Sequence, residues 1–127
     1  MNNRAIATSN APAAIGPYSQ AIKAEGVSIN VSGQLPIDPA TGEFAGDDIR
    51  SQTRQSLLNV KAILEEAGAG MSDVVETTVL LTDIAEFADM NEVYAEFFSA
   101  PYPARAAFQV VALPKGAKVE IKVVARV

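Results

Sequence analysis

Hydrophobic and polar positions along the chain recur with two different periods. Between residues 27 and 32 apolar and polar side chains alternate, which is typical of a half-buried strand, and Gly33 ends the pattern. Between residues 47 and 67 apolar side chains recur every three or four positions, and Gly68 follows the last of them. This spacing predicts a helix over residues 47–67, because one face of a helix repeats about every 3.6 residues.

A second strand and a second helix follow in the same order. The segment VVETTVLL at residues 74–81 is rich in β-branched side chains and predicts a strand. Residues 86–98 place aromatic and apolar side chains on one helical face, which predicts a helix. Asp83 and Glu86 have the spacing of a capping box, so we expect them to begin this helix together.

Turn-forming residues punctuate the remaining segments. Residues 104–111 and 118–126 both predict strands, and the short LPKGA segment between them predicts that they pair as a hairpin. Residues 11–20 hold two prolines and a glycine, which indicates a shaped loop, and we expect another hairpin at the N-terminal end. Residues 36–42 (PIDPATG) predict a further loop.

These elements together predict an α+β fold, a mixed β-sheet with two helices packed on one face, formed by a single domain of residues 1–127. The other face of the sheet then needs a cover. In the last strand this face carries Lys118, Glu120, Lys122 and Val124, a set too mixed to form a core alone. A subunit interface with polar sites embedded in it would account for such a face.

The composition excludes several classes of chemistry. The 127 residues include no His and no Cys, which removes the usual ligands of transition-metal sites and the Ser-His-Asp and Cys-His catalytic systems. A carboxylate site for Mg²⁺ or Ca²⁺ is the one metal site that remains open. Any reaction must therefore use Glu, Asp, Tyr, Lys, Arg or the backbone.

Charge and hydropathy narrow the expected partners and location. Ten basic and 15 acidic residues give a net charge of −5, which argues against nucleic acid because a negative surface repels phosphates. No stretch reaches the roughly 18 to 20 apolar residues of a membrane span, and the first residues lack the apolar segment of a signal peptide. We therefore expect a cytoplasmic protein with no membrane and no nucleic-acid partner.

Two charged residues in predicted strands are candidates for chemistry. Arg105 is flanked by alanines, and a guanidinium in an apolar strand is unfavourable unless it binds a carboxylate of the protein or of a ligand. Its small neighbours favour a ligand, because they leave room. For Glu120 the strand pattern favours an ion pair with a neighbouring Lys or Arg. The functional alternative is general acid–base catalysis or orientation of a water molecule, because without His a Glu is the best proton-transfer group left.

Three further residues stand out in the sequence, and each has an ordinary structural explanation. Tyr18, in the segment GPYSQ, could wall a pocket, although packing under its loop is the commoner role of such a residue. Asn91 interrupts the second helix, where a solvent-facing Asn is the ordinary explanation. Gly33 is explained by a turn that needs positive φ.

Four segments of the chain carry a resemblance to known proteins. In chain order they are GPYSQ, VSGQLPIDPATGE, QTRQSLLNVKAILEEAG and YPARAAFQVVALPKGAKVEIKVVA. Each motif is weak by itself, but the four occur together at the spacing of one family, nearly without gaps and over almost the whole chain. The chain resembles the RidA (YjgF-like) family of enamine/imine deaminases.

The resemblance implies an assembly and an activity. It implies a homotrimer of chorismate-mutase-like subunits whose sheets face the threefold axis, with active sites in the clefts between subunits. It also implies hydrolysis of 2-aminoacrylate and related imines to 2-keto acids and ammonia, as in 2-iminobutanoate/2-iminopropanoate deaminase. The implied ligands are small 2-imino and 2-keto acids, and neither a cofactor nor a metal is called for.

The family pattern also implies roles for particular residues. Arg105 takes the position of the clamp for the substrate carboxylate, and Glu120 that of the residue poised over the attacking water. The remaining positions would line the pocket with side chains or offer backbone contacts; they are Tyr18, Gly33, Asn91, Ala106 and Ala107. Many family members carry Cys at the position of Ala107, so control by thiol modification is excluded here while hydrolysis does not need the thiol.

Two rival functions remain at this stage. A trimeric protein that binds small carboxylates, or regulates through them, would use Arg105 but gain nothing from Glu120 beside it. A ribonuclease or translation inhibitor, as some relatives are described, is disfavoured by the absence of His and by the net charge of −5.

Overall fold

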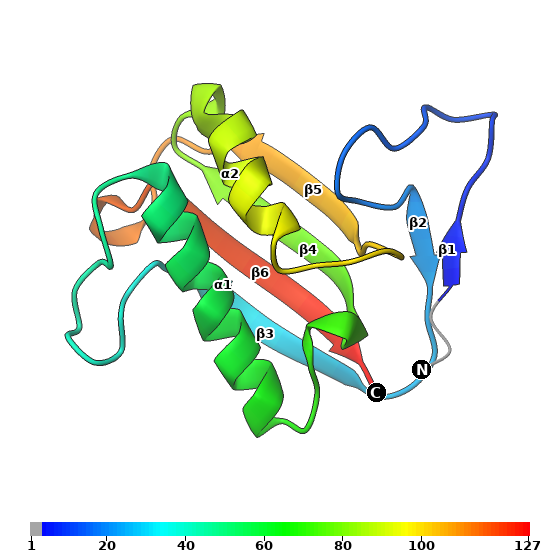
Figure 1. The fold of residues 1–127 in the computed structure, drawn as a ribbon, viewed down its shortest axis with the longest axis horizontal. Helices are drawn as coiled ribbons and strands as arrows, with labels where there is room; N and C mark the ends of the chain where they lie inside the picture. Colours follow the sequence, from blue (N-terminus) through cyan, green and yellow to red (C-terminus); the bar gives the residue numbers. More distant parts are fainter. Residues whose placement is uncertain (1–3) are drawn as a thin grey trace.

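The computed structural model describes residues 4–127 and confirms a mixed α+β arrangement. A four-stranded sheet has the order β3-β6-β4-β5, in which β4 and β5 are parallel and the other pairs antiparallel. Both helices cover the same face of this sheet (Figure 1). The bounds are β3 Ser28–Gln34, α1 Ile49–Glu66, β4 Val74–Leu81, α2 Phe87–Ala95, β5 Ala104–Gln109 and β6 Val119–Arg126.

The core lies between the two helices and the sheet. Strand β6 buries every second side chain, as a strand with one covered face should, and the helices present their apolar stripes to it. The buried residues include Leu57, Val60 and Leu64 of α1, Met90, Val93 and Tyr94 of α2, and Val119, Ile121, Val123 and Ala125 of β6.

The predicted C-terminal hairpin is wrong. Strands β5 and β6 are not neighbours, because β4 lies between them and pairs with both. The segment between them forms a 3₁₀ turn, η3 (Pro114–Gly116), and then carries the chain to the far side of β4. In this central position the apolar side chains of β6 are buried almost completely. The free energy of that burial outweighs the local preference of the turn residues for a hairpin.

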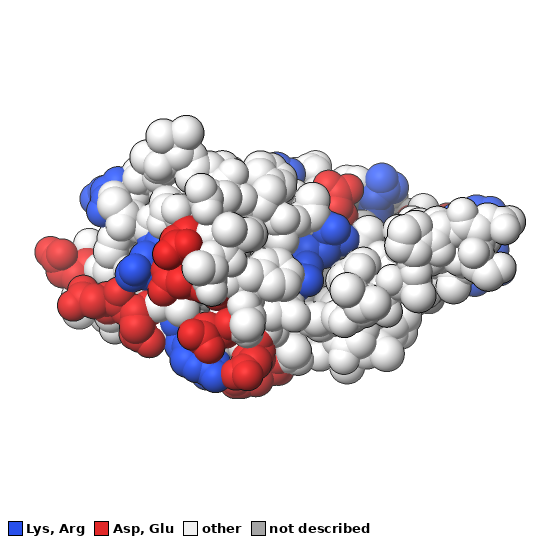
Figure 2. Space-filling view, turned by 90° about the horizontal axis from the view of Figure 1, so that it is seen from above, with Lys and Arg blue, Asp and Glu red and all other residues white. Residues whose placement is uncertain are grey.

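An antiparallel pair at the N-terminal end agrees with the predicted hairpin. Strand β1 (Arg4–Ile6) pairs with β2 (Ala21–Lys23) in a separate two-stranded sheet. The loop over residues 7–20 joins them and stands beside the main sheet (Figure 1). The chain has no Asp, Glu, Lys or Arg from Ala5 to Ile22, and in Figure 2 charged side chains gather at the end of the molecule with the helices rather than at this end.

Helix α1 agrees closely with its prediction. Asp48 is its N-cap, with a side-chain oxygen accepting from the backbone N–H of Ser51, and Gly68 follows its end with φ of +79°. Such a positive φ suits glycine, which has no Cβ to clash.

Helix α2 begins differently from its prediction. A 3₁₀ turn, η2 (Ile84–Glu86), precedes it, and the Asp83 carboxylate accepts from the backbone N–H of Ala85 at 2.9 Å. The expected capping box is not formed, because the Glu86 carboxylate instead contacts Lys118 at 3.4 Å. The helix ends at Ala95, short of the predicted residue 98.

Two ion pairs join the exposed sides of the helices. Arg50 pairs with Glu92, and Arg54 pairs with Glu96 at 2.7 Å. The paired residues are four positions apart on both helices, so the two contacts lie one turn apart. In the part of the chain that the structure describes, no helix combines the length and the apolar character that a membrane crossing needs.

Candidate functional site

Arg105 lies on the helix-covered face of the sheet, although β5 is an edge strand. In the β4–β5 pair it is level with Thr77, which is buried. Its guanidinium carbon lies 4.7 Å from the ring centroid of Tyr94, 5.4 Å from that of Tyr18 and 5.5 Å from that of Phe87. These distances allow cation–π attraction. Tyr18, Phe87 and Tyr94 thus form an aromatic cage around the guanidinium.

The polar partner of Arg105 within the chain is an amide. Its Nη1 donates to Oδ1 of Asn91 at 2.6 Å, and no Asp or Glu among residues 4–127 forms an ion pair with it. Burial lowers the pKa of Arg105, while Tyr94 and Tyr18 act in the opposite direction. Arginine has so high an ordinary pKa that the group remains a cation. The half-buried guanidinium therefore has hydrogen-bond donors left for a carboxylate from outside the chain.

The loop that carries Tyr18 is docked against the start of β5. The backbone N–H of Ser19 donates to the carbonyl of Pro103 at 3.1 Å, and the Ser19 hydroxyl donates to the carbonyl of Tyr102. Ser19 also forms a parallel bridge with Ala104, the residue before Arg105. The structure thereby brings together three predicted site residues, Tyr18, Asn91 and Arg105.

Tyr94 supports the cage from within the core. Its hydroxyl lies 2.8 Å from the hydroxyl of Thr77, and both side chains are buried. Burial raises the pKa of Tyr94 to about 12, although the Thr77 hydrogen bond and the Arg105 charge act in the opposite direction. The cage therefore presents neutral rings, not phenolates, to the guanidinium near neutral pH.

The raised pKa predicts a loss of stability in alkali. Unfolded tyrosine ionises near pH 10, whereas Tyr94 in the folded protein stays neutral up to about pH 12. The stabilisation is therefore complete below pH 10 and is lost as the pH rises toward 12, by about 2 to 3 kcal/mol. Urea unfolding at several pH values should show this slope in the wild type and a shallower one in Tyr94→Phe. Equal slopes would contradict the assignment to Tyr94.

Glu120 and Gly33 lie on the opposite face of the sheet from Arg105. Glu120 is level with Leu80 of β4, and its neighbours Val119 and Ile121 point into the core, so Glu120 faces away from the helices. The two β-strands pack so closely here that a Cβ built on Gly33 would lie 1.9 Å from Oε2 of Glu120. Gly33 therefore leaves the space that the Glu120 carboxylate occupies.

Two expectations for this region are wrong. Gly33 does not end its strand through a turn with positive φ: it lies inside β3, where the register with β6 shifts between Val31 and Gln34. The ion pair between Glu120 and a neighbouring Lys or Arg is also absent from residues 4–127, and Lys118 pairs with Glu86 instead. Close packing on the Glu120 carboxylate, not a turn, accounts for the glycine.

The predicted residues thus form two groups that one chain does not join. The alternation of β5 places Ala106 on the open face, where it is exposed, and Ala107 on the helix face, packed against the core. Strand β4 separates β5 from β6, so their axes are about 10 Å apart, and Arg105 and Glu120 point to opposite sides. A single small molecule cannot contact both residues of the same chain.

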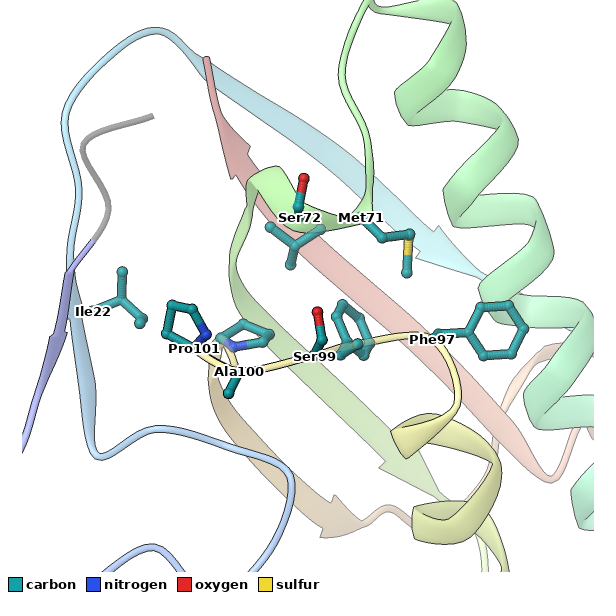
Figure 3. Close-up of a pocket in the computed structure, with 10 residues that line it drawn as sticks. Ile22, Met71, Ser72, Phe97, Ser99, Ala100 and Pro101 are labelled. Atoms are coloured by element: carbon teal, nitrogen blue, oxygen red, sulfur yellow. The ribbon is translucent and has the colours of Figure 1, made fainter.

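A separate cavity of about 180 Å³ carries none of the predicted residues. It lies between β2, the 3₁₀ turn η1 (Met71–Asp73) and the segment after α2 (Figure 3). Its lining is Ile22, Met71, Ser72, Val74, Phe97, Phe98, Ser99, Ala100, Pro101 and Pro103. None of these side chains is titratable, so the cavity offers no acid–base group. Among residues 4–127 no cluster of acidic side chains is arranged to hold a metal ion.

Phe87 and Tyr94 belong to the predicted apolar face of the second helix, and their place beside Arg105 was not predicted. The signal was their spacing. Phe87, Asn91 and Tyr94 follow each other at four and then three positions, which puts all three on one side of α2. An amide between two aromatic residues on a core-facing stripe is unusual enough to indicate a partner for that amide.

Residues 8–127 match the model of the family described as Endoribonuclease L-PSP. The chain belongs to this family. Solved structures of proteins named RidA and YjgF are among its matches, which confirms the resemblance to the RidA family. The match extends from the loop that carries Tyr18 to the end of β6, and so includes both groups of predicted residues.

Individual relatives of this RidA-family chain carry different names. A RutC family protein of Sinorhizobium fredii, y4sK, is 60% identical over 119 residues, which are 94% of each chain. The human 2-iminobutanoate/2-iminopropanoate deaminase is 47% identical over 122 residues, which are 96% of this chain and 88% of the human one.

Two solved structures show the same fold. RidA of an Antarctic Psychrobacter is 48% identical with a TM-score of 0.76, covering 98% of this chain and 99% of its own. TdcF of E. coli, solved with bound serine, is 44% identical with a TM-score of 0.76, covering 98% of both chains.

Proposed function

We propose that this chain hydrolyses reactive enamine and imine intermediates, 2-aminoacrylate and similar 2-imino acids, to 2-keto acids and ammonia. The observation that carries the proposal is Arg105, a half-buried guanidinium held by an aromatic cage and Asn91, with no carboxylate partner within residues 4–127. A desolvated guanidinium selects a carboxylate. The 47% identity to a human protein named 2-iminobutanoate/2-iminopropanoate deaminase supports the same substrate class.

The reaction needs little from the protein. The imine carbon is already electrophilic, so a held carboxylate, a placed water and a proton carrier suffice. Glu120 accepts a proton from the water as the water oxygen bonds to the imine carbon and the C=N electron pair moves to nitrogen, and it then passes this proton to that nitrogen, which gives the neutral carbinolamine. Glu120 next accepts the proton of the carbinolamine hydroxyl as the C=O bond forms and the C–N bond breaks, and it passes this proton to the leaving nitrogen, which departs as ammonia. Water is consumed, ammonia and the keto acid are released, and no oxidant or metal enters.

We propose further that the site is completed by a neighbouring subunit in a homotrimer. Arg105 and Glu120 lie on opposite faces of one sheet, so the clamp of one copy must meet the Glu120 of another. The open face fits an interface, because it carries Phe108, which is 48% exposed and level with Leu80, and Val124 further along the sheet. Among residues 4–127, β3 has no strand paired at its outer edge, and the outer edge of β5 has only the single bridge between Ala104 and Ser19.

The direct test is release of ammonia. Freshly generated 2-iminopropanoate should lose ammonia much faster with the protein than without it, and the keto acid should appear at the same rate. Hydrolysis at the rate of the protein-free control would refute the proposed activity.

The trimer makes a separate prediction. Sedimentation equilibrium should give a particle of about 40 kDa, three times the 13.3 kDa chain. Dilution that dissociates it should abolish turnover together with the assembly, because each site draws on two copies. A stable 13.3 kDa monomer with full activity would contradict the shared site.

Gly33→Ala should impair turnover with little effect on the fold. The new Cβ would lie 1.9 Å from Oε2 of Glu120, so the carboxylate must swing away from its place. Misplacing a catalytic group by about 1 Å can lower rates by roughly 100-fold, and we expect a fall in kcat of about 10- to 100-fold.

Gly70→Ala is the matched control for this change. Gly70 has a φ of −141° and no atom within 4 Å of the added Cβ, so the same methyl group enters open space. Its turnover should equal that of the wild type. Equal activity in both alanine variants would show that the position of Glu120 does not matter.

A further inference from the structure

Gln20 makes more of the hydrogen bonds within the loop over residues 7–20 than any other side chain described there. Gln20 accepts through Oε1 from the backbone N–H of Thr8 at 2.7 Å. Its Nε2 lies within donating distance of three carbonyl oxygens, those of Pro12 at 2.6 Å, Thr8 at 3.1 Å and Ala11 at 3.3 Å. The Gln20 amide thus bonds to backbone groups 8 to 12 positions earlier in the chain.

Hydrophobic burial does not supply this order. Every residue from Arg4 to Ile15 is exposed, and Ile15 is 92% exposed, so the outer part of the loop has no core of its own. Glutamine is suited to this role because its amide is a donor and an acceptor at once, whereas glutamate lacks the donor and methionine has only a weakly accepting sulfur. Gln20 is the last residue of the GPYSQ segment, for which the proposed function alone gives no reason.

The order that Gln20 imposes reaches the Arg105 site through two neighbouring residues. Ser19 fixes the end of the loop to the segment before β5, and Tyr18 places its ring 5.4 Å from the guanidinium carbon of Arg105. The Tyr18 hydroxyl lies 3.5 Å from the backbone N–H of Ile15, inside the same loop. The ring is therefore held between the docked end of the loop and the turns that Gln20 closes.

We propose that Gln20 is a positioning residue that holds Tyr18 over Arg105 and thereby sets the affinity of the site for the substrate carboxylate. The expected effect on substrate binding rests on the proposed function, whereas the expected effect on the position of Tyr18 rests only on the contacts of Gln20. Gln20 acts through Tyr18 and does not touch substrate. Losing it should weaken carboxylate binding and leave the chemistry of Glu120 unchanged.

Kinetics and binding test the effect on substrate. Gln20→Glu and Gln20→Met should raise the KM for 2-iminopropanoate and the Kd for pyruvate by about 10-fold, within the roughly 100-fold that misplaced binding groups produce, while kcat stays within about twofold. Asn10→Asp is the control, because it adds the same charge to the same loop. Asn10 bonds to the Thr8 hydroxyl through its backbone N–H, which the substitution keeps, so this variant should behave as the wild type. A fall in kcat with KM unchanged would overturn the proposal.

A double-mutant cycle tests whether Gln20 acts through Tyr18. If it does, adding Gln20→Met to Tyr18→Ala should raise KM little further, because the ring it positions is already gone. If the two fold-increases in KM instead multiply, so that their free energies add, Gln20 acts by another route and the proposal is overturned.

The resonance of the Arg105 Nε–H group gives a readout that needs no turnover. Ring currents of the aromatic cage shift this proton, so Tyr18→Ala should move the signal, and Gln20→Met should move it in the same direction. A signal at the wild-type position in Gln20→Met would overturn the proposal, whether or not the trimer is retained. If the signal moves as expected but the wild type hydrolyses no imine, the positioning of Tyr18 is supported and the proposed function is refuted.

Discussion

Arg105→Ala should abolish most of the activity while the protein still folds and assembles. Removing one partner of a desolvated charge pair costs about 2 to 5 kcal/mol, which corresponds to a loss of roughly 30- to several-thousand-fold in kcat/KM. Burial of Arg105 in the aromatic cage, with Asn91 as its amide partner, puts the expected loss in this range. The measurement is kcat/KM for 2-iminopropanoate, with sedimentation and thermal unfolding on the same sample.

Two comparison variants separate the clamp from a general effect of charge. Arg54→Ala removes a half-exposed guanidinium that pairs with Glu96 on the helix surface, and it should leave kcat/KM unchanged. Arg105→Lys keeps the charge but loses the planar, bidentate contact with a carboxylate, so it should retain only part of the activity. Near-normal turnover of a folded Arg105→Ala protein would mean that another group binds the carboxylate.

Glu120→Gln should slow turnover by about 10² to 10⁴, the usual contribution of a general acid–base group. The substitution keeps the shape of the side chain next to Gly33 and removes only the ability to take up a proton. Pyruvate should therefore bind as well as to the wild type, while kcat for imine hydrolysis falls. The measurement is kcat together with the Kd for pyruvate on the same variant.

The same variant separates an enzyme from a protein that only binds small carboxylates. A binding protein uses Arg105 and gains nothing from an acid nearby, so Glu120→Gln would then change neither affinity nor any measurable rate. If Glu120 instead pairs with a cation of a neighbouring subunit, the melting temperature of the trimer should fall with turnover intact. Glu92→Gln, which alters an exposed ion pair with Arg50, is the control for loss of one negative charge.

Much of the fold could be predicted because local patterns report local burial. The 3.6-residue spacing located α1 to within two residues at each end, and the β-branched segment located β4 at its observed bounds. The strands β5 and β6 were also located, but their pairing was not. Two strands with a turn signal between them have the pattern of a hairpin whether or not a third strand enters between them.

The candidate site could be predicted only as single residues. An Arg between alanines and a Glu in a strand are each unusual enough to be noticed in isolation. Their relation in space depends on strand order and on the parity of each position within its strand. The sequence pattern could not show that β4 separates them, nor that their side chains leave the sheet on opposite sides.

What the sequence by itself determined is the set of available groups and the local elements: no His, no Cys, two amphipathic helices, and an Arg and a Glu in strands. Only the tertiary structure decided which groups meet. It surrounded Arg105 with rings from α2 and from the N-terminal loop, and it set the Glu120 carboxylate against Gly33. The reason is physical, since periodicity depends on the neighbours of a residue along the chain, whereas these contacts join residues 11 to 87 positions apart and form only when the whole core is packed.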